Sequence, residues 1–522
     1  MSFRLQQIPW NLVLLMIVAA GLRFTFLDIK PAHFDEGVNG WFADELLANG
    51  YFRYDPTNYH GPLHFYAVFL SQNLFGRNLW ALRLPTVLVS LAAVFLCWKF
   101  GKRLGRTTGN VAAWAMAVSP AFLFYGRYAI HEAWLVFFLM LFAYGALGLW
   151  RTRSSRDATL VIVAVTGMIL TKETYIIHLT CFALAGLLTW GFAALHRERV
   201  PSPPALFYTC IRTVEQWPRW AIVTPLVLAA IVIVFFYSGN FLDWGSLNGL
   251  WQTYAAWFKT GVHEAGGHAK TAYDLWGQWF LNYYWILLFA RFEWPAFAGL
   301  LGSIRYLLPG RGDIRWIAIY ATGTLAGYSL VAYKTPWCIV SLLWPFLIVF
   351  GAVIEEAAKR SKPAALGVAV VVIACSGVYS AKLSYFDYAD HSHPYVYVQT
   401  DPGIRIATEP LLGMASRNPE FYHVEGQILL KSYYPLPWTL GDFTNVGYYG
   451  NEMLPPELDG DFILVEGNRR EEVEVLLKEP YFVREFKLRD GMDNALAYFK
   501  VSRYAEWFPN VKPEFIPGEK TP

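Results

Sequence analysis

Charged residues and cysteines are scarce in this sequence. Only 16% of its 522 residues are charged, whereas 55% are hydrophobic and 17% are aromatic, which is too apolar for an ordinary soluble domain. The net charge of +3 gives no basis for nucleic-acid binding. The five cysteines form no C-x-x-C pair, so packing is their expected role rather than a zinc site or a disulfide framework. The composition predicts a polytopic α-helical membrane protein.

Apolar runs long enough to cross a bilayer recur along residues 1–381. A spanning helix needs about 20 mostly apolar residues, and we count about eleven such runs. They lie near residues 9–27, 79–100, 109–126, 132–150, 158–173, 175–195, 220–237, 279–302, 314–333, 335–355 and 363–381. We expect the first run to be retained as a span rather than removed as a signal peptide, because a single Arg4 precedes it and many spans follow.

Basic residues collect in every second connection between these runs. The basic connections lie at 99–106, 151–156, 196–219, 305–315 and 359–362. Lys and Arg flank the cytoplasmic ends of spans, so the pattern predicts a cytoplasmic N-terminus and an extracytoplasmic C-terminus. The expected location is the cell (inner, cytoplasmic) membrane.

The other connections carry unusual polar clusters, which this topology places outside the cell. The first outer loop, 28–78, contains the acidic motif "FDEGVNGW" with Asp35 and Glu36, and a second outer loop spans 238–278. Further polar candidates in the outer connections are His60, His64, Arg127, His131, Glu132, Lys172, Glu173, His263, Glu264, His268 and Lys334. Together these residues predict an outward-facing polar site.

Three outer cations, Arg127, Lys172 and Lys334, sit at span ends where the positive-inside rule disfavours them. A lipid-linked phosphate or pyrophosphate would compensate them, since Arg offers a bidentate fork to phosphate and Lys a point charge. Glu132 and Glu173 would equally neutralise them as structural ion pairs. The residue types leave both interpretations open.

Metal binding is a separate question because His and Glu recur together. The histidines of "HEAGGH" at 263–268 are five residues apart, not the four of a helical H-E-x-x-H, which argues against a zinc protease. A divalent ion held by ligands from different outer loops stays open, although hydrogen bonding to sugar or backbone is the stronger interpretation. The sequence requires no cofactor.

Several motifs together resemble a known family. They are "DEGVNGWFADELL", "YHGPLHFYAVFLSQNLFGRNLWALRLPTVL", "SPAFLFYGRYAIHEAWLVFFLML", "GMILTKET" and "YKTPW" at 333–337 followed by Pro345. In their order and spacing they resemble the membrane-embedded C-type glycosyltransferases. They are most similar to protein O-mannosyltransferases, lipid A aminoarabinose transferases and flippase-associated glycosylation proteins. The resemblance covers about the first 175 residues by motif and the remaining spans by layout.

The resemblance implies a polyprenyl- or dolichyl-phosphate sugar as donor, with a protein, lipid or glycan as acceptor. By residue matching, Asp35 is the general base or acceptor-positioning group and Glu36 its acidic neighbour, while Arg127, Glu132 and Lys172 match family positions at the later spans. The chain departs from the family at residues 60–62, where it reads His-Gly-Pro instead of Lys-Pro-Pro. One expected phosphate contact is therefore absent or has become an imidazole.

The residue types fit glycosyl transfer independently of the family. The reaction needs a carboxylate to take the acceptor's proton and fixed cations where the phosphate leaves. Asp35 would supply the first, and Arg127, Lys172 and Lys334 the second. A base and a phosphate on opposite faces of the sugar predict inversion, and these cations would remove the need for a catalytic metal.

The composition changes near residue 382, which divides a transmembrane glycosyltransferase-like domain at 1–381 from a tail at 382–522. Strand patterns at 395–399 and 462–467 and helical patterns at 403–417 and 468–479 predict a small extracytoplasmic α/β domain. The aromatic stretch 433–450 is expected either to bind glycan or to pack against the membrane face.

Two other functions use the same features. A non-catalytic scaffold or binding subunit of a larger assembly would not need Asp35 ionised, and a lipid-linked sugar translocator would use the cations to recognise a head group. Both predict that Asp35→Asn leaves function largely intact, whereas a transferase loses turnover. The absence of paired broken helices of the transporter kind counts against translocation.

Overall fold

The structure is a computed structural model that describes residues 9–58, 60–196, 198, 215–262, 284–331 and 333–518. The chain divides into two compact units. The first comprises Met1–Leu27 with Asn49–Asp387, and the second comprises Asp28–Ala48 with Tyr388–Pro522. The chain thus leaves the first unit for a short stretch and returns to it. Residues 28–48, predicted as part of the transmembrane domain, belong to the second unit.

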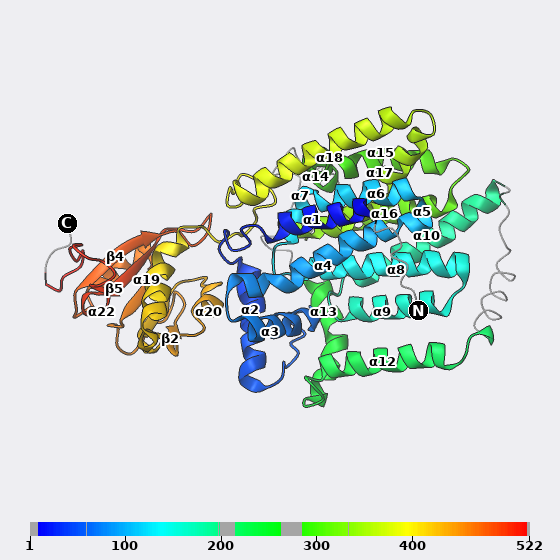
Figure 1. Ribbon diagram of the computed structural model, residues 1–522. Helices are drawn as coiled ribbons and strands as arrows, with labels where there is room; N and C mark the ends of the chain where they lie inside the picture. The colour runs from blue at the N-terminus through cyan, green and yellow to red at the C-terminus, as the bar shows by residue number, and fades with distance from the viewer. Residues whose placement is uncertain are drawn as a thin grey trace, which may run out of the picture. The chain divides into compact units, whose positions relative to one another are not determined.

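The first unit is a bundle of helices. Its helices are α1 (Trp10–Phe24), α3 (Leu63–Phe75), α4 (Leu79–Lys99), α5 (Gly101–Leu104), α6 (Arg106–Ala117), α7 (Pro120–Tyr125), α8 (Glu132–Thr152), α9 (Ser155–Ile169), α10 (Tyr175–Leu195), α12 (Trp220–Tyr237), α13 (Gly249–Val262), α14 (Tyr284–Phe292), α15 (Trp294–Ser303), α16 (Gly312–Leu330), α17 (Ile339–Ala358) and α18 (Lys362–Tyr385). Helices α4, α8, α9 and α12 lie side by side in that order (Figure 1).

The bundle is built around α17, which contacts α6, α15, α16 and α18. Of the most apolar 18 residues in Pro336–Ala358, which contains α17, 83% are buried; the corresponding share for α12 is 11%. Trp344 and Phe346 of α17 are fully buried. A helix that is apolar all round and buried on every side belongs to a core, whereas one that is apolar and exposed faces lipid. α12 is therefore a lipid-facing helix and α17 the central one.

Six helices in the described part of the chain are long and apolar enough to cross a membrane. They confirm six predicted spans: Leu79–Leu104, Glu132–Thr152, Tyr175–Leu195, Trp220–Tyr237, Pro336–Ala358 and Lys362–Tyr385. The predicted run 109–126 is instead broken into α6 and α7, because Ser119 caps a new helix with Pro120 at its first position. The protein is a multi-pass membrane protein, and the count of eleven spans stays a prediction.

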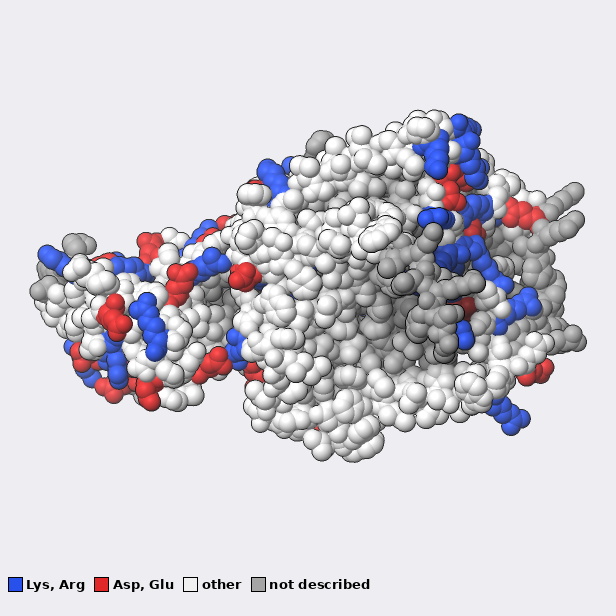
Figure 2. Space-filling view, in the orientation of Figure 1, with Lys and Arg blue, Asp and Glu red and all other residues white. Residues whose placement is uncertain are grey.

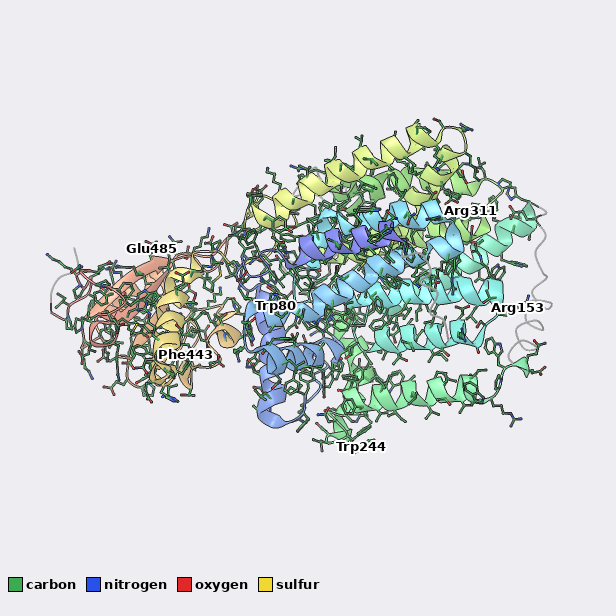
Figure 3. All side chains as sticks on the ribbon, in the orientation of Figure 1. Trp80, Arg153, Trp244, Arg311, Phe443 and Glu485 are labelled. Atoms are coloured by element: carbon green, nitrogen blue, oxygen red, sulfur yellow. The ribbon has the colours of Figure 1, made fainter. Side chains whose placement is uncertain are left out.

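Arg153 and Arg311 come from two different connections that were predicted to be cytoplasmic, and both lie at the same end of the helix bundle (Figure 3). Trp244 lies at the opposite end. Lys and Arg side chains gather at the end of Arg153 and Arg311 on the visible face (Figure 2). Ion pairs join the helix ends, with Arg103 2.5 Å from Asp157. The alternation of basic connections therefore corresponds to one physical end of the bundle.

The second unit contains a five-stranded mixed sheet in the order β2-β1-β3-β5-β4. Its elements are α2 (Phe34–Asn49, up to Ala48 in this unit), α19 (Ile404–Arg417), β1 (Glu425–Leu429), α20 (Leu436–Thr439), β2 (Asn445–Tyr448), β3 (Phe462–Glu466), α21 (Arg470–Glu474), β4 (Tyr481–Phe486), β5 (Ala495–Lys500) and α22 (Val501–Tyr504). β1 pairs in parallel with β2 and β3, while β5 pairs antiparallel with β3 and β4.

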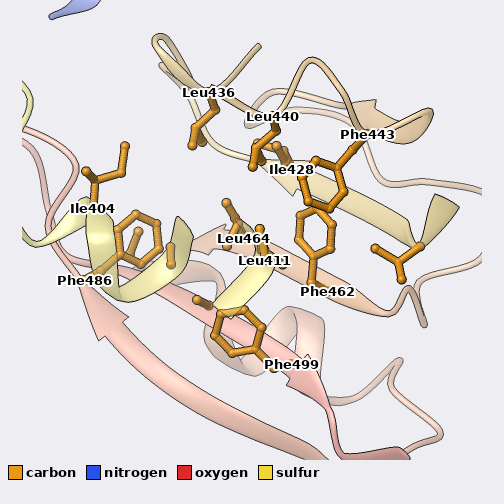
Figure 4. Packing of buried hydrophobic residues seen from close by; sticks show 14 of the residues in the cluster. Ile404, Leu411, Ile428, Leu436, Leu440, Phe443, Phe462, Leu464, Phe486 and Phe499 are labelled. Carbon is orange, nitrogen blue, oxygen red and sulfur yellow. The ribbon is translucent and has the colours of Figure 1, made fainter. Parts of the chain in front are cut away.

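Both faces of this sheet are buried. Phe462 and Leu464 pack with Ile404 and Leu411 of α19 on one face (Figure 4), whereas Ile463 of the same strand packs on the other. Alternate residues of a strand point to opposite faces, so a run of consecutive apolar residues, as in β3, marks a strand covered on both sides. The small α/β domain predicted for the tail is confirmed.

One predicted strand of the tail, 395–399, is wrong. The segment is irregular, because Val398 has a φ of 54° and interrupts the extended run. Instead of pairing in a sheet, this segment contacts Asp28–Ala48: the Gln399 side-chain amide donates to the Pro31 carbonyl at 3.2 Å. The helix predicted at 468–479 is also shorter, since α21 covers only Arg470–Glu474.

Candidate active site

The predicted site residues fall into both units. Asp35 and Glu36 belong to the second unit. The first unit holds the larger group: His60, His64, Arg127, His131, Glu132, Lys172, Glu173 and Lys334. His263, Glu264 and His268 lie outside the described residues.

In the first unit, the His60–Pro62 segment crosses the turn between α9 and α10. His60 and Lys172 form an antiparallel bridge, and the Gly61 N–H donates to the Thr171 carbonyl at 3.0 Å. A Cβ atom on Gly61 would lie 2.2 Å from the Leu170 carbonyl carbon. Only glycine allows so close an approach of two backbones, and Pro62 then precedes α3. The crossing therefore explains why position 61 is glycine in this chain.

Three imidazoles gather beside this crossing. The His131 ring lies 4.8 Å, centroid to centroid, from both His60 and His64. His60 Nδ1 is 3.0 Å from Glu173 Oε2. Burial, together with the neighbouring His60, His64 and Lys172, holds the pKa of His131 well below its ordinary value. His131 is therefore a neutral imidazole, and His60 is paired with the Glu173 carboxylate.

Lys172 and Glu132 form a buried ion pair. Burial opposes the lysine's charge, but Glu132, Cys338 and Glu173 outweigh it and hold the pKa of Lys172 well above its ordinary value. The structure thus contains the ion pair that was one of the two sequence interpretations; phosphate binding by Lys172 stays a prediction. Cys338 was assigned to packing, and the nearby "YKTPW" motif was the only sequence signal for its place beside this pair.

Arg127 binds the end of α1. Its guanidinium donates to the carbonyls of Leu22, Thr25 and Phe26 at 2.9, 2.8 and 2.6 Å. The last carbonyls of a helix lack partners within the helix, so Arg127 caps α1. The Arg127 guanidinium carbon also lies over the ring of Tyr385 of α18, 4.8 Å from the ring centroid. This structural role was not foreseen, and phosphate binding by Arg127 stays a prediction.

Lys334 is different from both. Its side chain is buried, at 1% exposure, and donates to the Val331 carbonyl. Within the described residues no carboxylate lies within 4 Å of its Nζ. Burial lowers the pKa of Lys334 to about 8. A buried ammonium without a carboxylate is costly, so of the three cations Arg127, Lys172 and Lys334, Lys334 is the one best suited to an anionic ligand.

In the second unit, the acidic motif begins α2. The His33 N–H donates to Glu36 Oε2 at 2.8 Å, and the His33 carbonyl accepts from the Gly37 N–H at 2.9 Å. This is the return half of a capping box, with Glu36 at the N3 position. Glu36 is fully buried. Its carboxylate therefore serves the helix start.

His33 has a defined tautomer. Its Nδ1 accepts from the Asp35 N–H at 3.0 Å, and its Nε2 lies 2.9 Å from the Tyr397 carbonyl, which only accepts. Nε2 must carry the proton, so the ring is neutral. Burial lowers the pKa of His33, in agreement with that state. His33 thus ties the acidic motif to the segment before α19.

Asp35 keeps its carboxylate free of hydrogen bonds from the residues that the structure describes. It is half-buried, and it acts electrostatically on Tyr397 and Arg489, raising the pKa of the tyrosine, which burial already raises. The Arg489 guanidinium lies over the Phe34 ring, 4.9 Å from its centroid, and donates to the Tyr434 carbonyl at 2.9 Å. The two adjacent acids are therefore not equivalent: Glu36 is a cap and Asp35 is available for chemistry. No motif in the sequence pointed to Arg489.

Two glycines of α2 set its packing. A Cβ on Gly37 would lie 2.5 Å from Pro435 Cα, and one on Gly40 would lie 2.3 Å from Trp438 Cδ1. Glycines three apart lie on the same face of a helix. Pro435 and Trp438 belong to the aromatic stretch 433–450, which had been expected to bind glycan or pack on the membrane. At these two residues it packs on the acidic helix.

Among the described residues, no group of three or more His, Cys, Asp or Glu side chains is placed to hold a metal ion. This holds for the imidazole cluster of His60, His64 and His131. It does not extend to residues 263–268, which lie outside the described residues. A metal requirement is therefore established neither way.

Comparisons with known proteins bear on the family resemblance and on the fold. Residues 59–211 match the family model described as dolichyl-phosphate-mannose-protein mannosyltransferase. The apo structure of ArnT from Cupriavidus metallidurans superposes with a TM-score of 0.57 at 15% identity, covering 93% of this chain and 97% of that one. The chain has the C-type glycosyltransferase fold. This confirms the resemblance found in the sequence.

Two further C-type glycosyltransferase structures are similar to varying degrees. ArnT from the same organism bound to undecaprenyl phosphate gives a TM-score of 0.58 at 15% identity, with 93% and 97% coverage. The Archaeoglobus fulgidus oligosaccharyltransferase gives 0.48 at 12% identity, covering 94% of this chain and 73% of that one. No curated protein sequence matches the chain.

Proposed function

We propose that the protein transfers a sugar from a polyprenyl-phosphate-linked donor to an acceptor at the outer face of the membrane, with inversion. The observation that carries the proposal is Lys334, a buried cation without a carboxylate partner among the described residues. The proposal is further supported by the family match over residues 59–211 and by the likeness to a protein solved with undecaprenyl phosphate.

The proposed step is a single displacement. The acceptor oxygen forms a bond to the anomeric carbon while the bond from that carbon to the phosphate oxygen breaks. Asp35 takes the acceptor's proton, and the polyprenyl phosphate leaves with the electron pair. Such a base contributes about 10²- to 10⁴-fold. Asp35 suits this role because its carboxylate makes no hydrogen bond to described residues, whereas the Glu36 carboxylate accepts from His33.

In this proposal Lys334 holds the donor phosphate and stabilises the charge that develops as it leaves. Lys172 contributes positive charge that Glu132 partly neutralises. His60 occupies the position where the family carries lysine and is assigned to the donor phosphate. Glu173 pairs with His60, and His64, His131 and Glu173 are assigned as supporting residues of the site. Arg127 orders the end of α1 and contributes positive charge toward the donor phosphate. No step requires a metal.

The test compares purified wild type with Asp35→Asn, Glu36→Gln, Lys334→Met and, as a matched acid control on α2, Asp44→Asn. Each protein receives a panel of polyprenyl-phosphate sugars, and release of free polyprenyl phosphate is measured with and without membrane extract as acceptor source. We expect Asp35→Asn to lose about 10²-fold or more in turnover while still binding donor. Glu36→Gln should lose thermal stability, and Asp44→Asn should behave as wild type.

Other outcomes identify other functions. Native mass spectrometry that finds a bound lipid on a protein that turns over no donor would favour a scaffold or binding subunit. Movement of labelled lipid-linked sugar across proteoliposomes, unaffected by Asp35→Asn, would favour translocation. The active donor would name the sugar, and the labelled product would show whether protein, lipid or glycan accepts it.

A further inference from the structure

A pocket lies between η5 (Ile304–Leu307), the end of α17 and the start of α18, separate from every residue of the candidate active site. Its volume is about 640 Å³, and the residues that shape it include Arg305, Val353, Glu356, Arg360, Ser361 and Val368. Lys and Arg side chains gather at the end of the bundle where α17 meets α18 (Figure 2). The pocket is open rather than enclosed, so a ligand can reach it.

The polar wall of the pocket has a positive balance. Arg305 and Arg360 contribute two cations, and Glu356 contributes one carboxylate. Glu356 Oε2 lies 3.4 Å from Arg305 Nε, and about half of the Arg305 side chain is exposed. Arg360 is exposed, and no carboxylate of the described residues lies within 4 Å of it. Lys359 and Lys362 flank Arg360 and add to the same charge.

The other wall is apolar and faces the bilayer. Val353 of α17 and Val368 of α18 line the pocket, and Val368 is 58% exposed. Val371, one turn further along α18, is 61% exposed. Because both helices are long and apolar enough to span a membrane, the pocket lies where their apolar surface gives way to water. A ligand that fits must carry an anionic head and an apolar body.

We propose that this pocket binds an anionic phospholipid of the leaflet at this end of the bundle. The phosphate lies between the Arg305 and Arg360 guanidinium groups, which offer bidentate donors to phosphate oxygens. The Ser361 hydroxyl adds a donor. The acyl chains follow Val368 and Val371 along α18. The site anchors the α17–α18 turn to the membrane surface. It uses none of the groups assigned to glycosyl transfer, so a test of this proposal does not depend on that function.

The test uses full-length protein in detergent micelles doped with phosphatidylglycerol or phosphatidylcholine. Native mass spectrometry counts bound lipids, and thermal unfolding reports the stabilisation. The variant is Arg305→Gln/Arg360→Gln. The matched control is Arg106→Gln/Arg156→Gln, which removes two exposed cations that do not line the pocket. Soluble glycerol phosphate is included to distinguish a lipid from a free phosphate.

Wild type should retain phosphatidylglycerol in preference to phosphatidylcholine, and the pocket variant should lose that preference roughly tenfold or more, since each basic residue near a membrane surface adds to anionic-lipid affinity. The control should retain it. The proposal is overturned if wild type shows no preference, if both double variants lose it equally, or if millimolar glycerol phosphate displaces the lipid. The last result would identify a soluble phosphate ligand.

Discussion

Gly61 approaches Leu170 so closely that a Cβ atom on Gly61 would lie 2.2 Å from the Leu170 carbonyl carbon. This contact joins the segment before α3 to the turn that carries Lys172 and Glu173. It brings the His60 imidazole within 3.0 Å of Glu173. The geometry of the imidazole cluster therefore depends on the absence of a side chain at position 61.

Gly61→Ala should separate the two backbones. The added methyl group breaks the Gly61–Thr171 and Leu63–Leu170 hydrogen bonds and should cost about 2 kcal/mol or more in unfolding free energy. Thermal unfolding in detergent measures the loss. Gly191→Ala is the control, because nothing lies within 4 Å of a Cβ there; alanine should be neutral or slightly stabilising in that helix. Equal melting temperatures for the two variants would contradict this interpretation.

The Lys172–Glu132 pair should show strong coupling. Lys172→Met leaves Glu132 buried without its partner, and Glu132→Gln does the same to Lys172, so each should cost about 3–5 kcal/mol. The double variant should recover much of that loss. A double-mutant cycle by thermal or denaturant unfolding measures the coupling, with the more exposed Arg470–Glu474 pair as a control of small coupling.

The same variants separate the two roles of Lys172. If its main task is structural, Glu132→Gln and Lys172→Met should weaken donor binding in parallel with stability. If Lys172 also contacts phosphate, Glu132→Gln should retain or strengthen donor binding while Lys172→Met weakens it. Donor affinity measured at a temperature where both variants are folded distinguishes these results.

Lys334 should give donor capture an alkaline limit. Its pKa is lowered to about 8, so the ammonium is charged below that pH and loses its charge as the pH rises through it. We expect kcat/KM for the donor to be level below about pH 8 and to fall above it. Lys334→Arg should move the fall to higher pH, because guanidinium stays protonated.

The control for this profile is Lys382→Met, which removes a more exposed lysine paired with Asp387 at 3.2 Å. It should retain the wild-type profile. Lys334→Met should have a low kcat/KM at every pH and no alkaline fall attributable to this residue. An unchanged alkaline fall in Lys334→Met would exclude Lys334 as its source.

The sequence predicted the membrane class, the fold family and the tail domain because each is encoded locally or by composition. Long apolar runs identify spans, and consecutive apolar residues in β3 identify a buried strand. The break of run 109–126 at Ser119-Pro120 carries a local cap signal that the apolar run obscured, but the hydrogen bonds from Ser119 and Ala121 to Glu293, far along the chain, could not be predicted. Contacts of that separation leave no periodic pattern.

The candidate site was predicted as a set of residue types but not as roles. Adjacent acids look alike in sequence, and only the hydrogen bond from the His33 N–H distinguishes Glu36 from Asp35. In the sequence Arg127 looked like a phosphate ligand because no partner for it could be recognised. Its actual partners are backbone carbonyl groups about a hundred residues upstream. Backbone acceptors carry no sequence signature, so structural and catalytic cations could not be separated.

The division of the chain has a consequence for biosynthesis. Asp28–Ala48 bears the acidic motif but packs with Tyr388–Pro522, and about 340 residues lie between them. At roughly 5–20 residues per second, translation takes about half a minute to cover that distance. Throughout this interval the nascent helix α2 has no Pro435 or Trp438 to pack against. The membrane bundle can begin to assemble during synthesis, but the acidic motif reaches its final environment only after Tyr388–Pro522 has emerged.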